Sequence, residues 1–87
     1  MFLHLGNDIV VNMKDIVGIF DMDNTTITKS GRKFLTHAQS AGMVINTTQE
    51  LPKSYILVQT EAETKVYISS ISSLTLLKRA KTSTIIL

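Results

Sequence analysis

Residues 43–59, MVINTTQELPKSYILVQ, decide the fold. Two β-prone apolar runs, one beginning at Met43 and one at Tyr55, flank a polar connection that ends in Pro52-Lys53-Ser54. Runs of this composition favour strands, so the stretch predicts two strands joined by a loop. Because loops on a rigid sheet commonly carry binding residues, we expect the functional residues in this connection.

Length and composition indicate one small domain over residues 1–87, with a hydrophobic fraction of 44% that is ordinary for a globular protein. The chain has no cysteine, which excludes disulfides and cysteine-ligated zinc. No stretch approaches the roughly 20 apolar residues of a membrane span, and the N-terminus lacks the basic region of a signal peptide. We therefore expect a cytoplasmic protein with no membrane partner. The net charge of +2 permits nucleic-acid binding without indicating it.

The N-terminal part of the chain reads as strands separated by polar breaks. We expect strands over 2–5, 9–11 and 16–20, with the first two forming a hairpin around residues 6–8, and one turn of helix over 12–15. The run 16–20 is almost continuously apolar, which indicates burial on both faces of a sheet.

A helix is expected next, over residues 28–41, with Gly42 ending it because glycine adopts the left-handed backbone of a helix stop. Apolar residues at helical spacing define its inner face, and cations gather on the opposite face. The inner residues are Ile27, Phe34, Leu35, Ala38 and Ala41, and the cations are Lys29, Arg32 and Lys33.

A further strand over 64–69 follows a turn at 61–63 and is expected to continue the strands of 43–59 as a meander. A short C-terminal helix should begin at Ser72 or Ser73. The order of elements predicts an α+β fold: a small, mainly antiparallel sheet with one main helix, a short C-terminal helix, and one parallel crossover around the main helix.

Within the C-terminal helix we expect Leu74 and Leu77 to face inward. The cations Lys78, Arg79 and Lys81 should lie near its C-terminal end, where they offset the helix dipole. The apolar tail 84–87 leaves three alternatives open, namely a further strand, packing on a neighbour, or a frayed end.

One stretch carries a catalytic pattern. Residues 19–25, IFDMDNT, resemble the first motif of haloacid dehalogenase-type phosphatases, in which Asp21 would attack phosphorus and Asp23 would act as general acid and base. The family also needs a large Rossmann-like domain, a lysine and a late acidic pair for Mg²⁺, and this short chain has no such pair. A loop that hydrogen-bonds its own backbone and opens a helix is the simpler explanation.

A second resemblance spans most of the chain. Its segments are FLHLG at 2–6, the Ile-Val, Lys-Asp-Ile and Ile-Phe-Asp groups within 9–21, AGMVI at 41–45, PKS at 52–54 and the Ser-Ser, Thr-Leu and Lys-Arg pairs within 72–79. In order and spacing these resemble the Rem family of small extracellular matrix regulators of Bacillus-like bacteria, and the RemB type more than the RemA type.

This resemblance implies a regulator similar to LytTR-like domains that assembles into rings and holds double-stranded DNA against a basic outer surface. In the RemA type, an arginine pair in the loop between the central strands contacts DNA, helped by a basic residue before the third strand. Lys14 occupies the second of these positions. Leu51 and Pro52 lie at or beside the arginine positions, where Lys53 is the nearest cation and Glu50 adds an opposing charge.

The candidate DNA-contacting residues are therefore Lys14, Lys53 with its neighbour Ser54, and the helix cations as an assisting patch. Those helix cations are Lys29, Arg32 and Lys33. Solvated surface lysines are the alternative explanation for each. His4 and His37 stand apart in the sequence and predict no metal site, and Tyr55 and Tyr67 read as half-buried packing residues.

We expect an oligomeric, ring-like transcriptional regulator of extracellular matrix (biofilm) genes that binds double-stranded DNA through basic loop residues. It should be no enzyme and should need no cofactor, metal or small-molecule substrate. The first alternative is an oligomeric protein-interaction module without DNA binding. The remote alternative is the phosphatase-like activity through Asp21 and Asp23.

Overall fold

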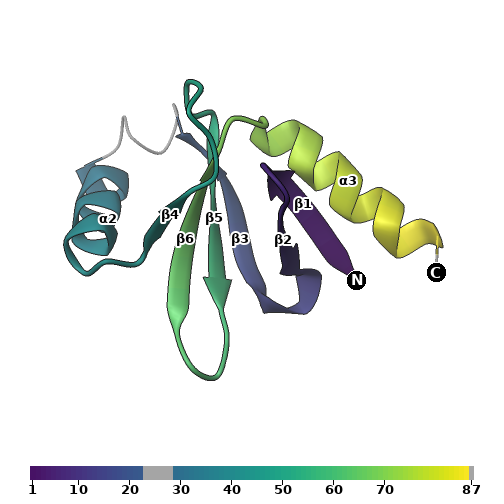
Figure 1. The fold of residues 1–87 in the computed structure, drawn as a ribbon, viewed down its shortest axis with the longest axis horizontal. Helices are drawn as coiled ribbons and strands as arrows, with labels where there is room; N and C mark the ends of the chain where they lie inside the picture. The colour runs from purple at the N-terminus through teal and green to yellow at the C-terminus, as the bar shows by residue number, and fades with distance from the viewer. Residues whose placement is uncertain (23–28, 87) are drawn as a thin grey trace.

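The computed structural model describes residues 1–22 and 29–86, with side chains described as far as Lys81 in the last helix. The predicted residues Asp23, Ile27 and Thr28 lie outside the described residues. The elements, in chain order, are β1 (Phe2–Gly6), β2 (Ile9–Asn12), the 3₁₀ turn η1 (Met13–Asp15), β3 (Ile16–Asp21), α2 (Lys29–Ser40), β4 (Val44–Asn46), β5 (Ser54–Gln59), β6 (Thr64–Ser69) and α3 (Ser73–Ile86). This content confirms the α+β fold (Figure 1).

The N-terminal hairpin forms as the sequence predicts. Strands β1 and β2 pair antiparallel around Asn7 and Asp8, which both adopt positive φ angles, of 47° and 63°. Asn and Asp tolerate this left-handed backbone better than most residues, so a tight turn without a central glycine is possible. The alternating pattern of β1 buries Leu3 and Leu5 and leaves Phe2 and His4 exposed.

The main sheet has four strands in the order β3-β5-β6-β4. Strands β3, β5 and β6 pair antiparallel, whereas β4 pairs parallel with β6. The predicted meander is confirmed for β5 and β6, which pair antiparallel, but it is wrong for β4 and β5, which are not neighbours. The chain leaves β4 at Asn46, and the loop 47–53 crosses over the end of β6 to reach β5. Along this path Thr47 N–H donates to the Ile68 carbonyl at 3.0 Å and Lys53 N–H to the Ser69 carbonyl at 2.9 Å.

The predicted parallel crossover around the main helix is present in an altered form. Strand β3 runs in the same direction as β6, because both are antiparallel to β5, and β4 is parallel to β6. The connection β3-α2-β4 therefore joins two strands of the same direction at opposite edges of the sheet.

Two apolar cores cover the two faces of the sheet, and β5 contributes to both. Ile56 and Val58 face a core completed by β1, β2 and Leu76 of α3. Tyr55 faces the other core, with Ala38 and Phe34 of α2. The two helices accordingly lie on opposite sides of the molecule (Figure 1).

Burial on both faces, predicted for residues 16–20, is found instead in β5. Strand β3 is an edge strand, and its Val17 is 59% exposed at an irregularity in the pairing with β5. Tyr55 of β5 is buried rather than half-buried, because the rings of Phe20 and Phe34 stack on it at centroid distances of 4.9 and 6.1 Å. In this sheet the central position of a strand, rather than the length of its apolar run, determines its burial.

Helix α2 follows the prediction closely in the residues described. Phe34, Leu35 and Ala38 pack against the sheet, and Gly42, with a φ of 72°, ends the helical segment. Ala41 is exposed, contrary to the prediction, because the helix ends at Ser40 and the chain turns away.

Helix α3 differs from the prediction in length and in phase. Ser72 caps it, since its Oγ accepts the Thr75 N–H at 3.2 Å, but the helical backbone continues to Ile86. The tail residues 84–86 are thus helical, and the cations at 78, 79 and 81 lie within the helix rather than at its end. The inward residue is Leu76, fully buried, whereas Leu74 and Leu77 are 63% and 44% exposed. No helix in the described residues has the length and apolarity needed to cross a bilayer.

Candidate nucleic-acid interface

The loop 47–53 is anchored firmly at its start. Thr47 is buried, its Oγ donates to the Ile68 carbonyl at 2.8 Å, and its own carbonyl accepts the Asn7 side-chain N–H at 2.6 Å. Within the loop, Thr48 N–H donates to Asn46 Oδ1 at 3.1 Å and Glu50 N–H donates to Thr48 Oγ1 at 2.9 Å. Such side chain–backbone turns give the loop a defined path before it reaches Lys53.

Lys53 ends the loop at a junction of three segments. Its N–H donates to the Ser69 carbonyl at the end of β6, and its carbonyl accepts the Met22 N–H just beyond β3 at 3.0 Å. The next residue, Ser54, is fully buried, and its Oγ donates to the Ile71 carbonyl at 2.6 Å. The backbone at Lys53 is thus fixed from both sides, while its side chain is exposed.

Ser54, predicted as a DNA-contacting residue together with Lys53, has its hydroxyl inside the structure. Its hydrogen bond to Ile71 attaches the start of β5 to the segment that leads into α3. In this arrangement Ser54 shapes the loop that presents Lys53 rather than facing the surface itself.

Lys14 and Lys53 lie at opposite ends of the β3-β5 pair. The register matches Ile16 with Val58 at one end and Asp21 with Ser54 at the other. At ~3.3 Å per residue, the strand length between these ends is roughly 17 Å. Lys14 is exposed on η1, but the two lysines that the sequence suggests as a pair do not form one local cluster within one chain.

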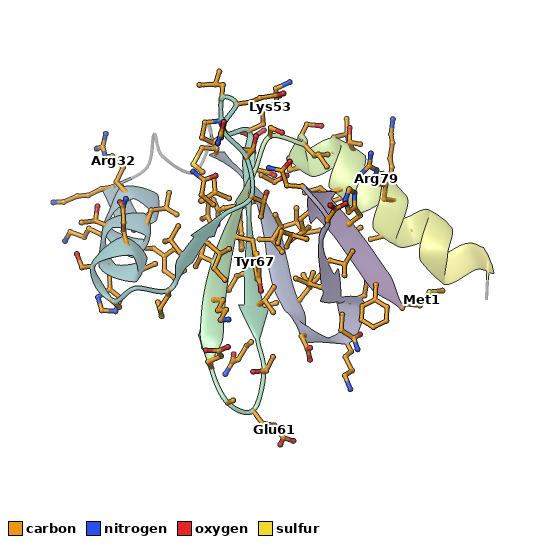
Figure 2. All side chains as sticks on the ribbon, viewed as in Figure 1. Met1, Arg32, Lys53, Glu61, Tyr67 and Arg79 are labelled. Carbon is orange, nitrogen blue, oxygen red and sulfur yellow. The ribbon has the colours of Figure 1, made fainter. Side chains whose placement is uncertain are left out.

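The cations of α2 belong to the Lys53 end. Lys29, Arg32 and Lys33 are all exposed on the first part of the helix, which follows the end of β3. Figure 2 shows Arg32 and Lys53 along the same upper edge of the molecule. The structure therefore places the start of α2 at the end of the sheet where Lys53 lies, and Lys14 at the other end.

None of these five cations forms an ion pair within the described part of the chain. Among the residues described, Lys65 Nζ forms an ion pair with Glu63 Oε1 at 2.9 Å, near the β5–β6 turn. That hydrogen bond, together with the charge of Glu63, raises the pKa of Lys65 above its ordinary value. Lysine and arginine side chains without an acidic partner are free to contact phosphate oxygens.

The geometry does not support the phosphatase pattern. Asp21 ends β3 opposite Ser54 in a mainly antiparallel sheet, whereas the phosphatase chemistry needs a large Rossmann-like domain. Asp23 is outside the described residues. Over residues 1–22 and 29–86, the His, Asp and Glu side chains form no group of three that could hold a metal ion.

The sequence does not predict the roles of two kinds of residue in this region. Thr47 and Ser69 hold the loop and β1 together, since Ser69 Oγ donates to the Leu5 carbonyl at 2.7 Å. No local sequence pattern distinguishes these two residues from other hydroxyl residues at strand ends. The sequence predicts Arg79 in a helix-end charge cluster, whereas Figure 2 shows it partway along α3, on the upper side of the molecule. The sequence shows only that Arg79 is a cation, because its position on the surface depends on the tertiary structure.

Two comparisons with known proteins bear on this interface. The family model RemA-like, described as extracellular matrix regulatory protein A-like, matches residues 2–80. Extracellular matrix regulatory protein B of Bacillus subtilis (strain 168) is 36% identical over 81 residues, which cover 93% of this chain and 91% of that protein. The family match includes every segment on which the sequence resemblance rests.

Proposed function

This chain belongs to the RemA-like family of extracellular matrix regulatory proteins, as its sequence resemblance predicts, and on this basis we propose that it regulates extracellular matrix (biofilm) genes by binding double-stranded DNA. The binding is mainly to the phosphate backbone. Lys53 makes the central contact, and the α2 cations Lys29, Arg32 and Lys33 assist it. The protein acts in the cytoplasm and is no enzyme.

One observation carries this proposal: Lys53 is an exposed cation on an anchored backbone, and it forms no ion pair with the part of the chain that the structure describes. The hydrogen bonds at its N–H and carbonyl fix where the side chain begins, so less conformational freedom is lost on binding than for a lysine on a flexible loop. Unlike an arginine pair that reads guanine edges, a single lysine gives a point charge with little sequence preference. We therefore expect sequence-tolerant binding.

Assembly into an oligomer, with a ring as the form that the family resemblance implies, completes the proposal. A few phosphate contacts from one subunit give weak binding, and repeated copies on one duplex add their counterion-release contributions. Lys14 lies about one strand length away from Lys53. Both lysines can contact one duplex if the duplex spans that distance, or if the two lysines belong to different subunits.

The test is fluorescence anisotropy with a labelled duplex, titrated at several salt concentrations. Wild type is compared with Lys53→Ala, with Lys14→Ala and with the double variant, and Lys65→Gln is the matched control because it also removes one positive charge. Each phosphate contact contributes about 0.9 to the slope of log K against log salt, so Lys53→Ala should reduce the slope and Lys65→Gln should not.

Three results would count against this proposal. Binding that Lys53→Ala leaves unchanged keeps DNA as the ligand but moves its site away from the loop. A well-folded oligomer that binds no duplex at low salt removes DNA binding altogether. A protein that remains monomeric at micromolar concentration by light scattering contradicts the assembly.

The alternative function, a protein-interaction module without DNA binding, has one observation in its favour. Leu51, in the loop beside Lys53, is 79% exposed, and Glu50 next to it opposes phosphate binding. An exposed apolar side chain on an anchored loop is suited to a pocket of a protein partner. This function would be established by an oligomer that does not bind DNA but binds a protein partner, if the substitution Leu51→Ser abolishes that binding.

A further inference from the structure

Charges in this chain are segregated between the helices and the rest of the fold. The sequences of α2 and α3 contain no Asp or Glu, yet together they hold six of the nine Lys and Arg residues. These six cations are Lys29, Arg32, Lys33, Lys78, Arg79 and Lys81. A helix that only needed solubility would usually carry both signs, so that oppositely charged neighbours support each other along its surface.

Both basic helices begin at the end of the sheet where Lys53 lies. The Lys53 carbonyl accepts an N–H from Met22, on the way to α2, and its N–H donates to Ser69, on the way to α3. The neighbouring Ser54 hydroxyl adds a bond to Ile71, just before α3 begins. Lys53 is therefore the connecting point between the two helices.

Seen down the shortest axis, Arg32, Lys53 and Arg79 follow one another along the upper edge of the molecule, from α2 across the loop to α3 (Figure 2). The view lays the 38 Å long axis horizontally, and the molecule is only 23 Å thick along the direction of view. A length of 38 Å corresponds to about 11 base pairs at ~3.4 Å each. The row thus fits within about one turn of a duplex.

Arg79 and Lys81 project in different directions from α3 because they occupy different positions around the helix axis. Leu76 is buried and Ala80 is half-buried, which defines the inner side of the helix. At 3.6 residues per turn, Arg79 lies on one flank of that side, and Lys81 lies nearly opposite Arg79 around the helix axis. Both side chains are exposed, so they differ in direction rather than in access to solvent.

Given the DNA-binding role proposed above, on which this step rests, we propose that the DNA-contacting surface extends onto α3. Arg79 contacts the phosphate backbone in one row with Lys53 and Arg32. A duplex is the ligand because the row is extended and positively charged, as a line of phosphates is extended and negative. Arg79 has no ion-pair partner among the residues described, and Glu50 is the acidic residue closest in sequence to the row.

The decisive comparison is Arg79→Ala against Lys81→Ala. Both variants remove one positive charge from an exposed position of the same helix, and alanine favours the helix, so both should fold. In salt-titrated anisotropy with a labelled duplex of more than two helical turns, each lost phosphate contact weakens binding roughly eightfold at 0.1 M salt and lowers the slope by about 0.9. We expect this effect for Arg79→Ala and none for Lys81→Ala. Circular dichroism and light scattering check that both variants keep the fold and assembly.

The outcomes separate the two proposals. If Lys53→Ala weakens binding but Arg79→Ala weakens it no more than Lys81→Ala does, Arg79 makes no specific phosphate contact, so the extension is wrong and the DNA-binding role stands. If wild type binds no duplex at low salt, the DNA-binding role fails and the extension fails with it. If wild type binds a polyglutamate peptide but not duplex, the row belongs to an acidic protein partner, which also overturns the extension.

Discussion

The phase of the C-terminal helix can be tested by comparing two adjacent leucines. Leu76 is fully buried in the core formed with Leu3, Leu5 and Ile56, whereas Leu77 is 44% exposed. Truncating Leu76 to alanine removes buried methyl groups and leaves a cavity, and such changes cost about 2–5 kcal/mol. The same change at Leu77 leaves a surface that is already partly in water, and we expect a cost of less than about 1 kcal/mol.

The assay is equilibrium unfolding in urea, followed by circular dichroism, at one fixed subunit concentration because assembly adds to apparent stability. In a chain of this size, a loss of about 3 kcal/mol corresponds to a fall in melting temperature of roughly 12–24 °C. Leu76→Met, which keeps the side-chain volume, should cost less than ~1.5 kcal/mol and controls for a variant that fails to fold.

One result would refute this reasoning. Suppose that Leu77→Ala lowers the free energy of unfolding as much as Leu76→Ala, and that both variants keep the wild-type m-value. The helix must then pack with a different face toward the core. The assignment of Arg79 to the upper edge would then lose its basis, because it depends on the same rotation of α3.

Three further changes test other parts of the fold by the same urea assay. Gly18→Ala would place a Cβ 2.6 Å from Phe20 Cζ, so the ring must leave its aromatic stack, and we expect a loss of about 0.5–1.5 kcal/mol; a stability equal to wild type would mean that the ring is not held there. Ser69→Ala removes the 2.7 Å donor of the Leu5 carbonyl, which keeps the longer bond from Thr47, and it also removes the acceptor of the Ile71 N–H. We expect a cost of about 1–3 kcal/mol, whereas an unchanged midpoint would argue against these contacts. Ser72→Ala removes the cap of α3 and should cost about 0.5–2 kcal/mol, accompanied by reduced helical signal; equal helicity in both proteins would contradict the cap.

The sequence predicted the local features of this fold well. The hairpin at 6–8, the turn at 12–15 and the glycine stop at Gly42 all depend on residues close to one another in the chain. Asn, Asp and Gly at those positions limit the backbone directly, and the structure has positive φ angles at Asn7, Asp8 and Gly42. Features of this kind need no knowledge of the rest of the molecule.

Long-range features were harder to predict, and the strand order is the clearest case. Nothing in residues 43–59 shows that β4 pairs with β6 rather than with β5, because both pairings bury the same apolar side chains. In α3, three leucines fall within four positions, so the pattern fits more than one phase. Only packing against β1 and β5 selects Leu76.

The candidate interface divides in the same way. The family resemblance points to Lys14 and Lys53, and residue type and helical spacing point to the α2 cations. In the structure α2 begins at the end of the sheet where Lys53 lies. The separation of Lys14 follows from the β3-β5 register, and the burial of Ser54 follows from its bond to Ile71. Neither can be read from sequence spacing, since the segments involved meet only in the folded chain.

The hydrogen bond from Ser69 to Leu5 joins positions 64 residues apart, and Leu76 packs on the same N-terminal hairpin. The apolar side of the hairpin is covered by β5 and α3, which are both distant from it in the sequence. Until these segments meet the hairpin, Leu3 and Leu5 remain in contact with water. Contacts between residues far apart in the sequence slow folding, so we expect the docking of the hairpin to limit the folding rate.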